Sequence, residues 1–395
     1  MKTALVHDWL TGMRGGERVL ERIARRFPDA PIFTMVWRRG SITAELETHP
    51  IHTSFLQRLP DAERRYRWLL PLYPAAIESF DLSAFDLVLS TSHAAAKAVR
   101  TRPDAFHLSY IHTPMRYVWE LEEQYFPPGR FPWPLDGAVR RICAGLRAWD
   151  VATSGRPSAL LANSRHVADR IRRHWGREAR VVYPPVARAG GPAPAGGERG
   201  GPREGYLLAG AFAPYKRSDL ALAACAGLGR ALTVAGSGQE EIRLRRLAGP
   251  DVRFAGWVED DTLTALLTHT RALLFPGEED FGIMPVEAMA CGCPVIAYGR
   301  GGALETVGRG ATETDRARVR SGGVARVPGG VLFGTQTVEG LKSAIETFER
   351  ERFDPDELRR LATPFSAERF DREFADALES GLAGAREHRE ASAVG

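Results

Sequence analysis

A segment rich in glycine, proline and alanine, residues 186–204 with the sequence VARAGGPAPAGGERGGPRE, divides the chain into two parts. It has no hydrophobic periodicity and cannot bury a core, which is typical of a linker. Strand-like runs start again beyond it, and 395 residues are too many for a single hydrophobic core. We therefore predict two domains, residues 1–185 and 205–364, joined by this linker.

Short apolar runs alternate with helical patterns in both parts. Strands that alternate with helices form parallel sheets with helices on both faces, and such sheets bind ligands beyond the carboxyl ends of their strands. The fold class is therefore α/β, with two Rossmann-like domains. The predicted strands are 3–7, 32–36, 86–90, 107–111, 159–162 and 181–182, then 206–209, 232–235, 252–255, 272–275, 295–297 and 331–333.

The end of the chain carries one further helical pattern. Phe370, Phe374 and Leu378 lie on one stripe of the segment 366–382. An apolar stripe of this kind packs against a core. We predict that residues 365–395 contain a C-terminal helix that returns to the first domain.

The composition is that of a globular protein, with 44% hydrophobic and 26% charged residues. The chain has no apolar run near the roughly 20 residues that span a bilayer. The N-terminus, MKTALVHDWL, reaches polar residues by position 7, so we expect a cytoplasmic protein without a signal peptide. No C-x-x-C ligand pair is present, and we expect buried reduced thiols at Cys143, Cys225, Cys291 and Cys293.

Residues 276–307, PGEEDFGIMPVEAMACGCPVIAYGRGGALETV, carry the strongest functional signal. The predicted strand 272–275 leads into a loop with Glu279, and a helix that begins near 284–285 carries Glu287. Two carboxylates placed around a strand-to-helix turn can accept hydrogen bonds from sugar and ribose hydroxyls, while the free N–H groups of the helix start can hold a phosphate. The alternative is an acidic loop that only caps a helix.

This segment resembles the E-x7-E region of the retaining glycosyltransferases of family 4, with Glu279 and Glu287 at its two glutamates. The resemblance implies the GT-B fold, in which two Rossmann-like domains face a central cleft, and no metal or other cofactor. It implies that Glu279 acts on the donor sugar as a catalytic residue and that Glu287 binds the nucleotide ribose. The other donor-binding residues implied for this segment are Asp280, Phe281, Gly282 and Ile283.

A basic turn follows the first predicted strand of the second part, in YLLAGAFAPYKRSDLALAA, residues 206–224. Lys216 and Arg217 stand before a helix, where cations are unfavourable unless an anion binds there. The family resemblance implies that Lys216 binds the donor diphosphate together with an arginine five positions earlier. Ala211 occupies that position here, so we expect Arg217 or another arginine to supply the second contact.

Two further places in the first part match the family. HDWLTGMRGGERVLE, residues 7–21, runs from a strand into Gly15 and Gly16, where a backbone without side chains lets a ligand approach closely. The resemblance places this turn against the donor sugar and diphosphate. His112 directly follows the strand 107–111 and corresponds to the active-site histidine of the family, beside the reacting sugar.

Basic and aromatic residues are mixed in residues 61–80, with Arg64, Arg67 and Trp68, and in residues 130–150. Residues 1–185 hold 27 Lys and Arg against 19 Asp and Glu, a difference of +8. Such segments either lie on an anionic membrane surface or form helices packed on their own domain. We keep both interpretations. The first implies a lipid-linked acceptor and a peripheral location on the inner face of the membrane.

The match is greatest to the mannosyltransferase-like branch, which implies transfer of mannose from GDP-mannose to a glycan or polyprenyl-linked acceptor in surface polysaccharide assembly. The alternatives are a UDP-sugar-dependent enzyme of the same fold and a non-catalytic protein that binds nucleotide sugars. A nucleic-acid-binding module is disfavoured because residues 186–395 hold 26 Lys and Arg against 30 Asp and Glu.

Overall fold

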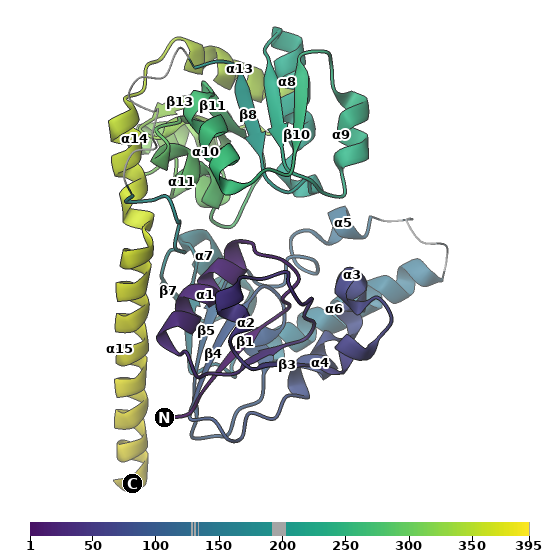
Figure 1. The fold of residues 1–395 in the computed structure, drawn as a ribbon, viewed down its shortest axis with the longest axis vertical. Coiled ribbons are helices and arrows are strands. Elements are labelled where there is room, and N and C mark those ends of the chain that lie inside the picture. Colours follow the sequence, from purple (N-terminus) through teal and green to yellow (C-terminus); the bar gives the residue numbers. More distant parts are fainter. Residues whose placement is uncertain (128, 130–131, 133, 192–202, 395) are drawn as a thin grey trace. The chain divides into compact units, whose positions relative to one another are not determined.

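The protein is described by a computed structural model that covers residues 1–127, 129, 132, 134–191 and 203–394. The chain forms two compact units (Figure 1). Unit 1 contains Met1–Pro185 and Glu368–Gly395, and unit 2 contains Val186–Ala367. Most of the predicted linker, residues 192–202, lies outside the described residues, as do Arg130, Phe131 and Trp133.

The core of unit 1 is a seven-stranded sheet in which every pair of neighbouring strands is parallel. The chain starts at β1 in the middle, moves outward to β3, and then returns to the other side of β1. The strand order is β3 (Ile51–Thr53), β2 (Ile32–Thr34), β1 (Thr3–His7), β4 (Leu87–Ser92), β5 (Phe106–Ile111), β6 (Ala159–Ala162) and β7 (Arg180–Val181).

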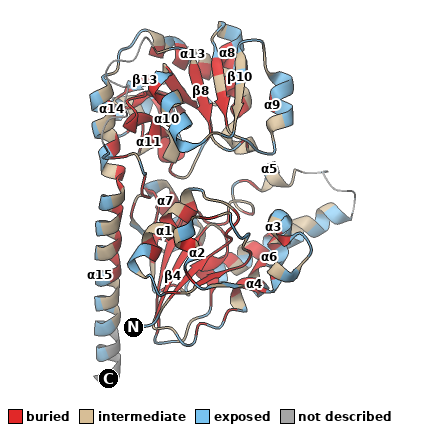
Figure 2. Cartoon of the chain, viewed as in Figure 1, coloured by how far each residue is buried: buried red, intermediate tan, exposed pale blue. Residues whose placement is uncertain are grey.

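Helices cover both faces of this sheet. Leu5 of β1 belongs to an apolar cluster with α1 and α15, whereas its neighbours Ala4 and Val6 belong to a second cluster with α4 and α6. Figure 2 shows that the central strands of the sheet are buried. Alternate residues of a strand point to opposite faces, so the two clusters lie on opposite sides of the sheet. The α-helices of unit 1 are α1 (Gly15–Arg26), α2 (Ala44–Glu47), α3 (Ala62–Arg65), α4 (Tyr73–Glu78), α5 (Glu122–Tyr125), α6 (Leu135–Ala152), α7 (Arg165–Trp175) and α15 (Ala367–Val394).

The C-terminal helix α15 packs on unit 1 through an apolar stripe. Phe370, Phe374 and Leu378 are buried in the cluster that contains β1, β4 and α1. The Arg22 guanidinium of α1 donates hydrogen bonds to the Asp371 carboxylate. The helix continues beyond the striped segment 366–382, as far as Val394.

Unit 2 repeats the topology with one change at its edge. Its strand order is β10 (Val252–Gly256), β9 (Leu232–Ala235), β8 (Tyr206–Ala209), β11 (Ala272–Phe275), β12 (Val295–Tyr298), β14 (Gly330–Phe333) and β13 (Val324–Val327). All pairs are parallel except β13 and β14, which form an antiparallel hairpin. The α-helices are α8 (Ser218–Leu228), α9 (Glu241–Leu247), α10 (Asp260–His269), α11 (Ile283–Ala290), α12 (Glu313–Arg320), α13 (Val338–Glu349) and α14 (Pro355–Ala362).

Short 3-10 helices complete both units. Those of unit 1 are η1 (Phe55–Arg58), η2 (Tyr66–Leu72) and η3 (Ala96–Ala98), and those of unit 2 are η4 (Pro214–Lys216), η5 (Gly301–Leu304) and η6 (Thr363–Phe365). No helix in the described ranges combines the length and the apolar character needed to cross a membrane.

The predicted α/β class with two Rossmann-like sheets is confirmed. Each predicted strand is present with bounds that differ by at most two residues, but β3 and β13 were not predicted. Both are short edge strands that are not buried along their whole length, and their sequences lack the continuous apolar run of a central strand. The four cysteines are buried free thiols, as predicted.

Candidate functional site

The strand order of each sheet reverses next to its first strand, and the candidate residues follow strands at or beside this point. In unit 1 the switch lies between β1 and β4, and in unit 2 between β8 and β11. Open parallel sheets bind ligands at the carboxyl ends of the strands at such a switch. Gly15, Gly16 and His112 follow strands of the first sheet, whereas Lys216 and Glu279 follow strands of the second.

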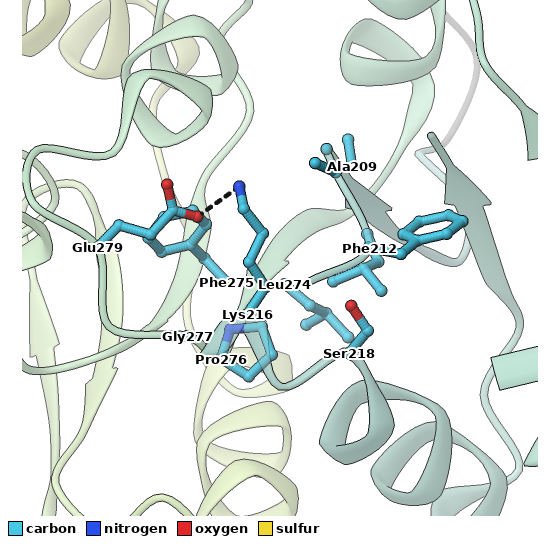
Figure 3. Close-up of a pocket in the computed structure, with 12 residues that line it drawn as sticks. Ala209, Phe212, Lys216, Ser218, Leu274, Phe275, Pro276, Gly277 and Glu279 are labelled. Atoms are coloured by element: carbon cyan, nitrogen blue, oxygen red, sulfur yellow. Dashed lines mark ion pairs between the residues drawn. The ribbon is translucent and has the colours of Figure 1, made fainter. Parts of the chain in front are cut away.

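Lys216 and Glu279 form an ion pair in unit 2. Lys216 lies after β8 and Glu279 lies after β11, and Lys216 Nζ is 2.7 Å from Glu279 Oε1 (Figure 3). Their side chains are 17% and 18% exposed, so neither charge is fully buried. A ligand can therefore replace the carboxylate as the partner of the ammonium without leaving a buried charge uncompensated.

Glycines bring the two loops together. A Cβ atom on Gly277 would lie 2.6 Å from Lys216 Cα, and one on Gly210 would lie 3.3 Å from Lys216 Nζ. Only a residue without a side chain permits the first approach. The small hollow at this place is lined by Leu208, Ala209, Gly210, Ala211, Phe212, Lys216, Ser218, Leu274, Phe275, Pro276, Gly277 and Glu279 (Figure 3).

Backbone conformation and a backbone hydrogen bond fix the loop between Glu279 and α11. Gly282 adopts a left-handed conformation with φ of 85° and precedes the first residue of the helix. The N–H of Gly302 donates to the Glu279 carbonyl over 2.8 Å. Phe281 is buried and packs edge-on against Phe365 at 5.4 Å, so its side chain belongs to the core of unit 2. Any contact of Phe281 with a donor would therefore come from its backbone.

The first turn of α11 receives no side-chain hydrogen bond from its capping residue. Asp280 and Ile283 are half-buried around its start, and the Gly282 that caps the helix has no side chain to satisfy its first N–H groups. The helix begins one residue earlier than predicted, at Ile283. This arrangement suits an anion at the helix N-terminus.

Glu287 on α11 is buried and pairs with an arginine that the sequence had not singled out. Arg188 Nη1 lies 3.2 Å from Glu287 Oε1. The same guanidinium donates to Thr264 Oγ1 over 2.8 Å and to the Asp260 carbonyl over 2.6 Å. Arg188 belongs to the segment interpreted as a linker, and an arginine in a Gly/Pro-rich stretch gives no signal of such a contact.

Arg217 has a partner on its own helix. Its backbone is left-handed with φ of 50°, and its guanidinium donates to both oxygens of Asp219 over 3.1 and 3.2 Å. Ala211, where the family has an arginine, is exposed and lines the hollow beside Lys216. The structure thus brings Lys216 to Glu279 but holds Arg217 on Asp219.

His112 is buried at the end of β5, with 6% of its surface exposed. Its backbone carbonyl accepts a hydrogen bond from Asn163 Nδ2 over 2.9 Å, and its Nε2 has no hydrogen-bond partner among the described residues. Burial, and then the charges of His93 and His7, hold the pKa of His112 well below its ordinary value. His112 is therefore neutral near pH 7.

Gly16, the second residue of α1, lies against a second histidine that the sequence analysis did not single out. The rings of His93 and His112 stack with centroids 4.2 Å apart and planes 13° apart. A Cβ atom on Gly16 would lie 2.1 Å from His93 Nε2 and 3.4 Å from His112 Nε2. Gly16 and His112, which the sequence predicted separately, therefore lie together in unit 1, with Gly15 as the first residue of α1.

The basic and aromatic segment 61–80 is partly buried and partly exposed. Tyr66 and Tyr73 are buried against Trp9 at 5.1 and 6.0 Å, whereas Trp68 is 67% exposed. On α6, Leu135 is 55% exposed. The described part of the chain holds no group of three or more His, Cys, Asp or Glu side chains placed to bind a metal ion.

Two family models match the chain over most of its length. The model described as "Glycosyltransferase Family 4" matches residues 13–189, and the model described as "Glycosyl transferases group 1" matches residues 199–363. The chain belongs to the group 1 and family 4 glycosyltransferases. The matched ranges contain all the site residues of the two units described above.

Solved structures of glycosyltransferases share the fold. The structure of Anabaena HepE in complex with UDP and glucose matches with a TM-score of 0.64 and 18% sequence identity, over 96% of this chain and 100% of that one. At this identity the likeness shows the GT-B fold alone.

Curated relatives match over shorter stretches. The glycogen synthase of Mycobacterium tuberculosis is 30% identical over 219 residues, 52% of this chain and 52% of that protein. A GDP-mannose-dependent monoacylated α-(1-6)-phosphatidylinositol monomannoside mannosyltransferase of Corynebacterium glutamicum is 39% identical over 87 residues, 19% of this chain and 23% of that protein. The chain thus spans about half or less of the length of these relatives.

Proposed function

We propose that the chain is a retaining glycosyltransferase that moves a hexose from a nucleotide diphosphate sugar to a glycan or polyprenyl-linked acceptor. The observation that carries this proposal is the ion pair of Lys216 with Glu279, set between the carboxyl ends of β8 and β11. In this proposal residues 205–364 bind the nucleotide sugar, and residues 1–185 bind the acceptor.

Donor binding exchanges the partner of Lys216. The diphosphate takes the ammonium as its counter-ion, which frees the Glu279 carboxylate to accept hydrogen bonds from the sugar hydroxyls. The N–H groups at the start of α11 add a second source of positive potential. Arg217 joins the diphosphate only if it leaves Asp219, which holds it through two hydrogen bonds.

Glu287 accepts hydrogen bonds from the ribose. Arg188 lies beside this buried carboxylate, and an opposite charge within about 4 Å favours the charged form. An ionised carboxylate only accepts hydrogen bonds, which matches the two hydroxyl donors of a ribose.

His112 contributes an uncharged hydrogen-bonding group on the side of the donor sugar. Its buried Nε2 lacks a protein partner among the residues described, and Gly16 leaves the space beside it free of a side chain. A buried polar atom without a partner is unfavourable, so a sugar hydroxyl that pairs with it is stabilised relative to water.

The reaction breaks the bond between the anomeric carbon and the phosphate oxygen, and the electron pair leaves with the nucleoside diphosphate. The acceptor hydroxyl attacks from the face of the departing phosphate, and its proton passes to the phosphate oxygen. Lys216 and the start of α11 stabilise the charge that develops on the leaving group. This proposal requires no metal.

We propose GDP-mannose as the donor, in surface polysaccharide assembly. The similarity to a GDP-mannose-dependent mannosyltransferase supports this choice. A UDP-sugar is the second candidate, because HepE, which shares the fold, is solved with UDP and glucose. The exposed Trp68 and Leu135 and the arginines of residues 61–80 support a lipid-linked acceptor and a peripheral location on an anionic membrane.

The test is nucleotide release from GDP-mannose and UDP-glucose without added metal, in the wild type and in Glu279→Ala. We expect the wild type to turn over one of the two donors. Glu279→Ala should turn over the same donor at a rate lower by about 10²- to 10³-fold. The assay is run with added glycan and polyprenyl-linked acceptors. Binding of a nucleotide sugar without turnover in the presence of any of these acceptors would instead identify a non-catalytic binder.

A further inference from the structure

Beyond the residues already assigned to the reaction, unit 1 holds a ring that fixes His112. His93 directly follows β4, one strand away from the end of β5 where His112 lies. One face of the His93 ring stacks on His112 at 4.2 Å, and the Trp9 ring lies parallel to it within 20° at 6.0 Å. The edge that carries Nε2 faces Gly16.

The backbone of His93 is held by a buried carboxylate. Asp8, at the end of β1, is 0% exposed and accepts four backbone hydrogen bonds. Its Oδ2 accepts from the N–H groups of His93 and Ala94 over 2.5 and 2.9 Å, and its Oδ1 accepts from Ala95 and Ala96 over 2.7 Å each. Each oxygen of Asp8 accepts two of these hydrogen bonds. The carboxylate therefore fixes the backbone of the turn from His93 to Ala96.

The ring of His93 therefore has little freedom to move. A Cβ atom on Gly16 would lie 2.1 Å from His93 Nε2, which means that the start of α1 is already in contact with the ring edge. Asp8 fixes the backbone, Gly16 limits the ring edge and His112 covers one face. A ring held in this way fixes the plane of the ring stacked on it.

We propose that His93 is a positioning residue that sets the plane of the His112 imidazole, and that Asp8 positions His93. This inference rests on the proposed function, in which His112 Nε2 meets the donor sugar. Its consequence is a fixed direction for the Nε2 atom, which has no partner among the described residues. Misplacement of a catalytic group by about 1 Å can slow a reaction by up to about 10²-fold, although the group itself remains.

The first test is a double-mutant cycle on turnover of GDP-mannose and UDP-glucose. We expect His93→Ala to lower kcat by about 10-fold and to leave KM for the donor within about threefold. His112→Ala lowers kcat more, and the double variant equals His112→Ala, because His93 acts only through His112. Losses that multiply in the double variant would overturn the proposal.

The matched control is His52→Ala. His52 on β3 is exposed and stacks on Phe33 with centroids 4.9 Å apart, so this variant also removes a stacked imidazole from unit 1. We expect its kcat to equal that of the wild type. A loss in His52→Ala equal to that in His93→Ala would show a general effect of losing a stacked ring and would overturn the proposal.

The second test needs no donor and therefore separates this proposal from the proposed function. NOEs from the ring protons of the free protein at pH 7 report the orientation of each histidine ring. We expect one consistent set of NOEs from the His112 ring in the wild type and averaged NOEs in folded His93→Ala and Asp8→Asn. Unchanged His112 NOEs to residues other than His93 in both variants would overturn the positioning role even if no nucleotide sugar is turned over.

Discussion

Units 1 and 2 place different kinds of side chain at the carboxyl ends of their strands. In unit 2, Lys216 follows β8 and Glu279 follows β11, and the two side chains pair at 2.7 Å and are each about one-sixth exposed. In unit 1, His93 follows β4 and stacks on His112, which follows the neighbouring strand β5, and the pKa of the buried His112 is lowered by burial and by its histidine neighbours. We call these two groups of residues the half-sites. The half-site of unit 2 is a charged pair whose lysine can exchange its partner, whereas the half-site of unit 1 is a neutral imidazole held by a stacked ring.

The difference indicates what each half-site can bind. A partly exposed lysine can give its charge to a phosphate at little loss, since the glutamate it leaves is open to water. A buried neutral imidazole cannot neutralise a diphosphate, but it can direct a hydrogen bond. We therefore assign the anionic part of the donor to unit 2 and a role at the sugar to His112 of unit 1.

The largest effect is expected from removal of the charge in unit 2. Lys216→Ala should lower kcat/KM for the donor by about 10²- to 10³-fold, because the diphosphate loses its counter-ion in both the ground state and the transition state. Lys342→Ala is the matched control, since Lys342 pairs with Glu339 at 3.1 Å on α13 in the same unit. Equal steady-state kinetics of Lys216→Ala and the wild type would remove the distinction between the two half-sites.

A smaller loss, of a different kind, is expected in unit 1. His112→Ala should lower kcat by about 10²-fold, because a directed hydrogen bond to the reacting sugar is lost. Calorimetry should show GDP or UDP affinity within about twofold of the wild type, since unit 2 holds the nucleotide. A large loss of nucleotide affinity with unchanged kcat would reverse the roles assigned to the two units.

A moderate effect is expected at the ribose carboxylate. Arg188→Ala leaves the buried Glu287 without the cation 3.2 Å away, which favours protonation of the carboxyl group. Nucleotide affinity should fall by about 10-fold, because a carboxyl group without its cation accepts hydrogen bonds from the ribose less well. Unchanged affinity of folded Arg188→Ala in titration calorimetry would mean that Arg188 does not support the role of Glu287.

The smallest change is expected in stability and should arise in unit 1. Burial lowers the pKa of His107 to about 3, and the pKa of His112 is also lowered. Both imidazoles are neutral in the folded protein but take up protons in the unfolded chain below about pH 6.5. Stability should thus be full above pH 6.5 and fall by up to about 2 kcal/mol per histidine between pH 6.5 and 5.

Urea unfolding at pH 7, 6 and 5 measures this loss, and His107→Gln and His112→Gln should each reduce its slope. A slope that both variants leave unchanged would mean that other groups control acid unfolding. It would also remove one physical basis for calling the unit 1 half-site uncharged.

The sequence predicted the central strands and the loops that follow them because long apolar runs and glycine turns are local signals. It placed Lys216, Glu279 and His112 after the correct strands for the same reason. It missed the edge strands β3 and β13, whose residues resemble those of loops.

The contacts that complete the half-sites join distant segments and leave no local pattern. Arg188 meets Glu287 across 99 positions, and Asp8 meets the backbone of His93 across 85. Phe281 lies in the same motif as Glu279, which lines the hollow, yet its side chain packs on Phe365. A motif identifies the loop, but the packing around the loop decides which way each side chain points.

The central claim is that unit 2 binds a nucleotide through Lys216 and Glu287. The most direct test is calorimetric titration of the wild type and Glu287→Ala with GDP, UDP, GDP-mannose and UDP-glucose, without added metal. We predict micromolar binding of one nucleotide and its sugar by the wild type, and binding weaker by at least about 10-fold in a folded Glu287→Ala. Failure of the wild type to bind all four, or equal binding by Glu287→Ala, would contradict the claim.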